Sequence, residues 1–287
     1  MKNTIQLIIV AAIITLFFGC DKIENPVIKT GDYRADLYGP VPAFLNVENP
    51  VQNVLLEDFT GHDCGNCPAG HAIANGIITN YPERVSLVAI HAGTLAQPYP
   101  PNYPSDWTTP EGTYYLLTQV GADEMPKGRM NRTPDSHIAY SPSTWVNKTN
   151  AALAESPQVQ LQLATNYNAE NKHLSVHVNH QWFQGLIGKY NLVIMLTESH
   201  IIAPQLWYNH TPEHVEEYEH NHMLRTTLTG ATGRIVANNP SSGFNTTNSY
   251  TIDWKDEWVA ENCEVIAFIT EGEDGRVLNC VHRKLVE

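Results

Sequence analysis

The sequence has few basic residues and few cysteines, and it has no apolar run long enough to cross a membrane as a helix. Its 17 Lys and Arg stand against 30 Asp and Glu, which makes the net charge −13. A chain this acidic repels the phosphates of nucleic acids and anionic lipids, so we expect no nucleic-acid partner. Hydrophobic residues make up 42% and charged residues 16%, which is typical of a globular protein. The length of 287 residues favours two domains.

An apolar run at 7–18 follows Lys2 near the N-terminus. It is shorter than the ~20 residues that a transmembrane helix needs, and it fits the core of an export signal. Gly19 and Cys20 come next, and a signal that ends in a small residue and Cys resembles that of bacterial lipoproteins. The resemblance implies that residues 1–20 are a lipoprotein signal peptide, with lipid on Cys20 as the membrane anchor. An ordinary cleaved signal is the alternative. Residues 21–50 are polar and contain proline, and we expect them to form a tether.

Apart from Cys20, the chain contains four cysteines, namely Cys64, Cys67, Cys263 and Cys280. An exported protein is in a compartment where disulfides persist. Proximity in sequence favours pairing Cys64 with Cys67 and Cys263 with Cys280. The second pair flanks the last predicted hairpin, so we expect the two side chains to face each other across it. Two free buried thiols are the alternative.

The first cysteine pair lies between a predicted strand and a predicted helix. Residues 54–59 are mostly apolar, apolar residues then recur at helical spacing until Pro82, and residues 85–91 form a second apolar strand. Strand, helix and strand predict a βαβ unit with a parallel sheet. Cys64 and Cys67 therefore lie at the helix N-terminus, where the helix dipole favours a thiolate.

A pair of cysteines two residues apart is found in haem attachment, in zinc sites, in inert disulfides and in redox couples. Haem attachment requires His directly after the second cysteine, and Pro68 stands there. Zinc needs two more ligands, and His62 and His71 do not obviously converge. A disulfide that closes so small a loop stabilises little, which favours a redox couple over a structural bridge. In such a couple Cys64, the more exposed, would exchange with substrate and Cys67 would resolve the mixed disulfide.

The order of strand, Cys64–Cys67 motif, helix and strand resembles the thioredoxin superfamily. The resemblance implies that Pro126, just before the next strand, is that fold's cis-proline and faces the cysteines. Cys64, Cys67 and Pro126 would then be the catalytic residues. A helix that begins at Ser141 and Pro142 would close the domain.

An insertion at about 92–124 departs from that pattern. Its second half, from Thr109 to about Val120, predicts a helix. Its irregular first half is expected to cover the cysteine end of the sheet. Tyr99, Tyr103 and Trp107 would either line a peptide groove there or bury themselves in a packed loop.

The pattern changes after Pro157. Apolar residues alternate at 159–163 and 174–178, further strands follow, and no helical spacing appears. Short strands with turn signals predict an antiparallel β-sandwich of the immunoglobulin-like kind. The expected architecture is therefore two domains of mixed α/β and α+β class. A thioredoxin-like domain at 51–156 precedes a β-sandwich at 157–287.

Five histidines lie between His200 and His222. His220 and His222 are two residues apart, and on a strand they would share a face, which makes them the candidates for a metal site. Nothing else in the pattern indicates a known site, and a charged solvated loop accounts for the segment equally well. We therefore predict no metal and no cofactor.

Taken together, the motifs resemble those of the Omp28-related outer membrane lipoproteins of Bacteroidetes-type bacteria. The resemblance rests on Cys20, FTGHDCGNCPAGH at 59–71, MPKGRMNR at 125–132, and YEHNHMLR at 218–225 with the TLTGATG that follows. It implies a lipid-anchored protein of the cell envelope, periplasmic or surface-exposed, at the outer membrane.

Two functions are open for such a protein. One is thiol–disulfide exchange with the thiols or disulfides of envelope or surface proteins. The other is a non-catalytic lipoprotein, an adhesin or assembly partner, that uses the thioredoxin-like fold as a scaffold. Fold does not decide between them. Asp63 beside Cys64 opposes a thiolate, whereas a protonated His62 would favour it.

Overall fold

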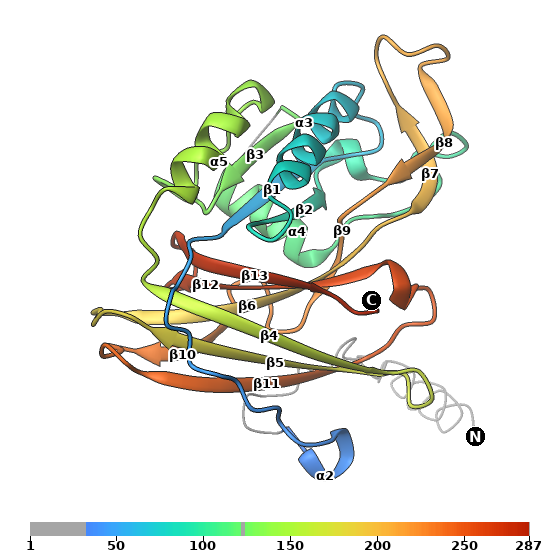
Figure 1. Cartoon of the computed structure of the whole chain (residues 1–287). Helices are drawn as coiled ribbons and strands as arrows, with labels where there is room; N and C mark the ends of the chain where they lie inside the picture. Colours follow the sequence, from blue (N-terminus) through green and yellow to red (C-terminus); the bar gives the residue numbers. More distant parts are fainter. Residues whose placement is uncertain (1–32, 122–123, 287) are drawn as a thin grey trace, which may run out of the picture.

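Strands dominate the fold, which is mixed α/β with few helices (Figure 1). The computed structural model describes residues 33–121 and 124–286. The expected signal peptide and Cys20 lie outside the described residues. In the described part of the chain, no helix is long and apolar enough to span a membrane.

The described strands are β1 (Val54–Thr60), β2 (Val85–His91), β3 (Lys127–Met130), β4 (Val159–Asn168), β5 (His173–Trp182), β6 (Lys189–Glu198), β7 (Ile201–Leu206), β8 (His214–His220), β9 (Met223–Thr227), β10 (Arg234–Asn238), β11 (Asn245–Asp253), β12 (Cys263–Glu271) and β13 (Val277–Lys284). The described α-helices are α2 (Ala35–Tyr38), α3 (Cys67–Asn80), α4 (Pro110–Tyr114) and α5 (Trp145–Leu153). Short 3-10 turns and a π-helical turn at Tyr115–Val120 complete the helical segments.

One sheet connects most of the strands, in the order β13-β12-β6-β9-β2-β1-β3, with β10 beside β6. β1 and β2 are parallel, and β3 is antiparallel to β1. β2 meets β9 at a single bridge, between Ala89 and Met223. A second sheet has the order β11-β5-β4, and β7 and β8 form a separate two-stranded hairpin. The main sheet and its cores thus run across the boundary expected at 156/157.

The predicted strand, helix and parallel strand around the cysteines are confirmed. Every residue of β1 and β2 is buried, which matches their nearly continuous apolar sequence. Helix α3 begins at Cys67 with Pro68 in its first turn, where a missing N–H costs nothing. Its buried Ala74 and Ile77 pack with β1 and β2 in one core cluster. At the helix start predicted for Ser141 and Pro142 the chain forms a 3-10 turn, Pro142–Thr144, and helix α5 follows from Trp145.

The predicted antiparallel strands after Pro157 are confirmed as well. β4 and β5 form a hairpin, and so do β12 and β13. A large apolar cluster joins β4, β5 and β11 to β6 and β12, so the two sheets pack face to face here. The segment at 201–220, which carries no alternating apolar pattern, was not predicted to be strands and forms the β7–β8 hairpin.

Part of the expected tether lies along the β11-β5-β4 sheet (Figure 1). The Val47 amide donates to Gln181 Oε1 at 2.9 Å, and the Val51 amide donates to Gln160 Oε1 at 2.8 Å. The ring of Tyr33 lies edge-on to His177, with centroids 5.0 Å apart. These contacts hold the described residues before β1 against the sheet.

A buried ion cluster ties β1 to β3. Glu57 lies opposite Arg129 in the β1–β3 register, and both its oxygens accept hydrogen bonds from Arg129 and Arg132 at 2.5 to 3.1 Å. All three side chains are fully buried. Burial opposes the charge on Glu57, but the two arginines outweigh it and lower the pKa of Glu57 to about 2. The rings of Tyr115 and Phe268 pack against the Arg132 guanidinium.

Removing the charge of Glu57 should destabilise the whole protein. Glu57→Gln leaves two buried guanidinium groups without a counter-ion, and breaking a buried pair from one side costs about 3–5 kcal/mol. Urea unfolding followed by circular dichroism measures this loss. Glu124→Gln is the matched control, because Glu124 is 83% exposed in its pair with Lys127 and should leave the midpoint unchanged. Equal midpoints for both variants would contradict the structural role of the cluster.

Candidate functional site

Cys64 and Cys67 form a disulfide, as predicted, in the turn between β1 and α3. Their Cα atoms are 5.4 Å apart. The Cys64 amide donates to Gly61 O, and the Cys67 amide donates to Cys64 O, so the turn is closed by its own backbone. Helix α3 begins at the second cysteine. In the reduced protein, the first-turn N–H groups of α3 would face the pair and favour negative charge there.

The disulfide is not at the surface, which corrects the expectation of a solvent-side pair. The Cys64 side chain is 3% exposed and the Cys67 side chain 0%. The sequence predicted that the insertion after β2 covers the cysteine end of the sheet. The tertiary structure brings a second, distant segment against the cysteine turn, the β7–β8 hairpin.

The end of β7 lies along the cysteine turn. The amides of Leu206 and Tyr208 donate to the carbonyls of His62 and Gly65, each at 2.8 Å. The Tyr208 ring covers Gly65 so closely that a Cβ there would lie 2.5 Å from ring carbons. Glycine at position 65 is therefore required by this contact.

Gln205 makes a second set of contacts with the same turn. Its Nε2 donates to the carbonyls of Cys64, at 3.1 Å, and Gly61, at 3.3 Å. The side chain is fully buried, and its Oε1 has no hydrogen-bond partner among the described residues. Gln205 thus fixes the backbone beside the disulfide at the cost of one unsatisfied acceptor.

The insertion covers another side of the turn, as expected. The Asp63 amide donates to Leu95 O at 3.0 Å, and His62 Nε2 lies 2.9 Å from Gln97 O. His62 also stacks on Tyr103, with centroids 5.0 Å apart. Residues 110–120 are helical, as predicted.

The three aromatic residues predicted for the insertion do not line a common groove. Tyr103 is 5% exposed and packed between His62 and His214. Tyr99 is 65% exposed, and Trp107 lies under the Arg225 guanidinium.

The peptide bond between Met125 and Pro126 is cis, in agreement with the expectation for Pro126. Its ring packs against α3, because a Cβ built on Gly70 would lie 2.9 Å from Pro126 Cγ. Gly70 is three residues beyond Cys67, so Pro126 lies beside the first turns of the helix that carries the pair. Its catalytic role stays a prediction.

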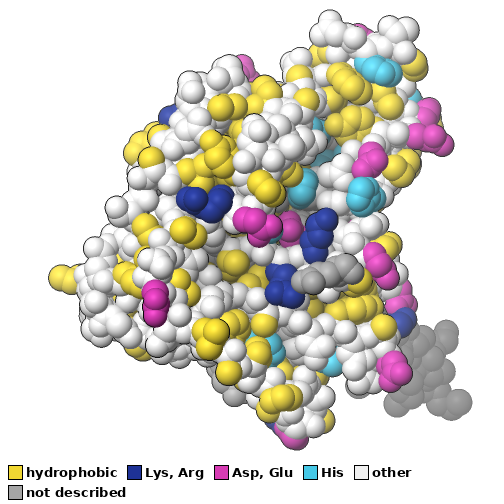
Figure 2. All heavy atoms as spheres, in the orientation of Figure 1, with side chains coloured by type: hydrophobic (Ala, Val, Ile, Leu, Met, Phe, Trp, Pro, Cys, Tyr) yellow, Lys and Arg dark blue, Asp and Glu magenta, His cyan; other side chains and the backbone are white. Residues whose placement is uncertain are grey.

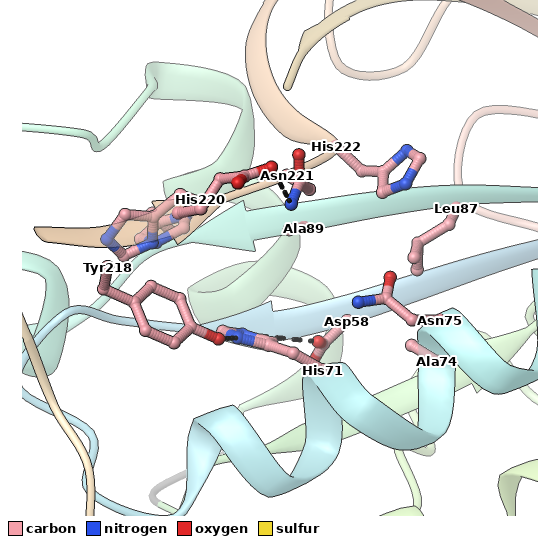
Figure 3. Close-up of a pocket in the computed structure, with 12 residues that line it drawn as sticks. Asp58, His71, Ala74, Asn75, Leu87, Ala89, Tyr218, His220, Asn221 and His222 are labelled. Carbon is pink, nitrogen blue, oxygen red and sulfur yellow. Dashed lines mark hydrogen bonds and ion pairs between the residues drawn. The ribbon is translucent and has the colours of Figure 1, made fainter. Parts of the chain in front are cut away.

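A buried polar cluster lies between α3, β1 and β8 (Figure 3). His71 Nδ1 is 2.8 Å from the Tyr218 hydroxyl, and His71 Nε2 is 2.8 Å from Thr60 Oγ1 and 3.8 Å from Asp58 Oδ2. Burial raises the pKa of Asp58 to about 8 and lowers the pKa of His71 to about 3. At neutral pH the carboxyl therefore keeps its proton and the imidazole is neutral, and the two are not an ion pair.

A small cavity of about 30 Å³ adjoins this cluster, which is room for about two water molecules. Asp58 Oδ1 and both ring nitrogens of the buried His91 make no hydrogen bond to the rest of the described chain. His91 lies edge-on to His220, with centroids 5.4 Å apart. Burial lowers the pKa of His220 to about 4, so it too is neutral at neutral pH.

The two candidate metal ligands do not converge. Figure 3 shows His220 and His222 at different ends of the cavity. Among residues 33–121 and 124–286, no group of three or more His, Cys, Asp or Glu is arranged to hold a metal.

The predicted bridge between Cys263 and Cys280 is wrong, because both are free, buried thiols. Cys280 lies opposite Phe268 in the β12–β13 register, five residues from Cys263. Five is an odd number, so the two side chains point to opposite faces of the sheet. They belong accordingly to different core clusters.

Asp58, Gln205, Tyr208 and Tyr218 were not singled out from the sequence. Asp58 is an acidic residue inside an apolar strand, and this position in the sequence indicates a buried polar group. The other three lie about 140 residues from the cysteine turn or from the helix residue that they contact, in a segment without alternating pattern.

Alkylation under denaturing, non-reducing conditions should label Cys263 and Cys280 and leave Cys64 and Cys67 unlabelled. Peptide mass spectrometry identifies the labelled residues. Labelling of all four after prior reduction is the control for accessibility. A bridged Cys263–Cys280 peptide would contradict the β12–β13 register.

Asp58 should make stability fall as the pH rises. The unfolded chain releases this proton near pH 4, whereas the folded protein keeps it to about pH 8. Between these values the folded state binds one more proton, so its free energy of unfolding falls with rising pH, by at most about 1.4 kcal/mol per pH unit. Asp58→Asn removes this slope. Urea unfolding at several pH values measures it, with the exposed Asp253→Asn on β11 as control. Parallel pH profiles for wild type and Asp58→Asn would contradict the buried proton.

Comparison with known proteins gives the family and one similar fold. The family model described as outer membrane protein Omp28 matches residues 114–287. HBP35 of Porphyromonas gingivalis has a similar solved structure, with a TM-score of 0.65 and 19% identity over 83% of this chain and 76% of that one. A domain of the outer membrane lipoprotein Omp28 from Porphyromonas gingivalis is 19% identical over 46% of this chain and 91% of that one, with a TM-score of 0.31. No curated protein matches the chain.

Proposed function

The chain belongs to the outer membrane protein Omp28 family, and from that premise we propose that it is a lipid-anchored thiol–disulfide exchange protein of the cell envelope. Its reactive pair is Cys64 and Cys67, and its substrates are thiols or disulfides of envelope or surface proteins. The observation that carries the proposal is the disulfide between β1 and the first residue of α3.

The surroundings of the pair support a thioredoxin-like unit. β1 and β2 are parallel neighbours, β3 is antiparallel to β1, and a cis-proline precedes β3. Helix α5 follows, and the Trp145 ring lies against Gly128 of β3. In this proposal Pro126 positions substrate beside the pair. The β-rich remainder of the chain extends the same sheet. We propose that its two packed sheets form an immunoglobulin-like sandwich.

The exchange moves two electrons and changes no other bond. A substrate thiolate attacks Cys64 Sγ, the Cys64–Cys67 bond breaks, and Cys67 leaves as a thiolate. A second substrate thiolate then attacks the substrate sulfur of the mixed disulfide and releases Cys64. The substrate dithiol is oxidised to a disulfide and the protein is reduced to a dithiol. The reverse sequence reduces a substrate disulfide.

A non-catalytic role is the second candidate, and two observations favour it. The pair is buried under other parts of the chain, and the family model begins at residue 114, after the cysteines. In this alternative the disulfide only holds the turn at the start of α3.

A trapping experiment separates the two roles. In Cys67→Ser the mixed disulfide formed on Cys64 cannot be resolved, so envelope partners should accumulate on the protein as adducts that dithiothreitol releases. Non-reducing electrophoresis and mass spectrometry of the purified lipoprotein measure them. The control is the double variant Cys64→Ser/Cys67→Ser, which should carry none. Equal adduct levels in both variants would support the non-catalytic role.

A further inference from the structure

The β7–β8 hairpin, residues 201–220, is an appendage to the fold rather than part of its sheets. Within the described residues, β7 and β8 pair with each other and with no third strand. Figure 1 shows the hairpin projecting at the upper right, away from the two packed sheets. A two-stranded hairpin is marginally stable alone, so its position depends on what it contacts.

Those contacts are mostly polar. None of the three hydrophobic core clusters contains a residue of the hairpin. Tyr218 is held to α3 by the His71 ring, and His214 to the insertion by the Tyr103 hydroxyl at 3.2 Å. Figure 2 shows histidine, acidic and apolar side chains interspersed along this arm. Polar contacts can be replaced by contacts with water at little net cost in free energy. We therefore expect the free energy for local opening of the hairpin to be among the lowest in the molecule.

The contact with the cysteine turn has the form of a bound extended peptide. Leu206 and Tyr208 are two residues apart, and both direct their N–H groups to carbonyls of the turn. Alternate N–H groups on one edge are what an extended segment offers when it adds to a backbone. The ring of Tyr208 fills the space over Gly65, where no side chain competes with it.

The contact between the hairpin and the cysteine turn also has an energetic cost. Gln205 Oε1 is buried and accepts no hydrogen bond from the part of the chain that the structure describes, so it regains water when the hairpin leaves. With the hairpin and the insertion both in place, Cys64 is 3% exposed, so a substrate thiol reaches the disulfide only when one of them moves.

We propose that hairpin 201–220 is a displaceable internal ligand of the cysteine turn. It occupies the surface where an extended polypeptide carrying a thiol or disulfide binds, and the hairpin leaves when that polypeptide arrives. The partner offers two N–H groups on alternate residues to the carbonyls of His62 and Gly65, and its side chain at the second position lies over Gly65. The choice of substrate in this inference rests on the proposed function. The displacement of the hairpin is independent of that function.

Reduction of the disulfide by dithiothreitol tests displacement without any protein substrate. Two electrons and two protons pass from dithiothreitol, which closes to its cyclic disulfide, to Cys64 and Cys67. Tyr208→Ala and Gln205→Ala each remove a contact that holds the hairpin, and each should speed reduction about tenfold. Ile202→Ala is the matched control, because Ile202 is on the same strand and 57% exposed. Its rate should equal that of wild type. Rates unchanged in both contact variants would overturn the proposal.

A double-mutant cycle shows whether the effect passes through the covering ring. Gly65→Ala places a methyl group against Tyr208 and should itself speed reduction. In the Tyr208→Ala background the three nearest atoms that this methyl group would meet are gone, so the same substitution should add little further. Equal effects in the two backgrounds would mean that Gly65→Ala acts on the disulfide directly, and would overturn the role of the ring.

Hydrogen exchange tests the opening of the hairpin in the wild-type protein, so the result does not depend on whether a variant folds. The amides of Leu206 and Tyr208 should exchange through hairpin opening, about a hundredfold faster than the amides of β6 and with a weaker dependence on urea. Exchange at the rate and urea dependence of β6 would show that the hairpin leaves only on global unfolding, which overturns the proposal.

A peptide in trans tests the class of partner. The peptide APQLWYNH, residues 203–210, should slow reduction of the Tyr208→Ala protein at ~mM concentration, which is the effective concentration that a tethered hairpin reaches. The same peptide with alanine in place of its tyrosine should slow it less. No slowing by either peptide would overturn an extended polypeptide as occupant. If the hairpin opens as expected but Cys67→Ser traps no partner, the displacement stands and the exchange function fails.

Discussion

The carboxylate of Glu57 is the constraint on which the rest of the site depends. It accepts hydrogen bonds from two arginines in a place that water does not reach, and the two arginines keep their counter-ion only when β1 and β3 are aligned in this register. The aromatic faces of Tyr115 and Phe268 offset the remaining positive charge. Those rings come from the insertion and from β12, and the cluster therefore aligns three parts of the chain. Cys64 follows Glu57 by seven residues, so its turn starts from a strand that cannot shift.

Two kinds of attachment surround the cysteine turn, and they differ in strength. The insertion sends Tyr115 and Leu116 into the central core, where burial of apolar area holds them. The hairpin at 201–220 contributes to none of the apolar clusters and is held by hydrogen bonds and ring contacts. If the disulfide exchanges with a substrate, the substrate reaches it on the side of the hairpin, because the hairpin is attached more weakly than the insertion. The same polar attachment places Asp58, His71 and Tyr218 together, and burial keeps the first two uncharged at neutral pH. A neutral interface can separate without having to move buried charges.

Local patterns predicted local elements well. Apolar continuity at 54–59 and 85–91, helical spacing after Cys67 and alternation at 159–163 and 174–178 all correspond to the elements that form, because each pattern reflects the face that an element buries. The errors concern relations between elements. Cys263 and Cys280 flank one hairpin, yet an odd register turns them to opposite faces. The exposure of Cys64 depends on residues about 140 positions away, and no spacing in the sequence carries that information.

The sequence by itself determined that a cysteine pair stands between a buried strand and a helix, that Pro126 precedes the next strand, and that the second half is antiparallel. These are consequences of periodicity, turn chemistry and short-range spacing. Only the tertiary structure decided that one sheet joins both halves, that the thiols of β12 and β13 stay apart, and that hairpin 201–220 lies along the cysteine turn. The physical reason is that burial and access depend on which surfaces meet, and contacts between distant segments are set by the packing of the whole chain.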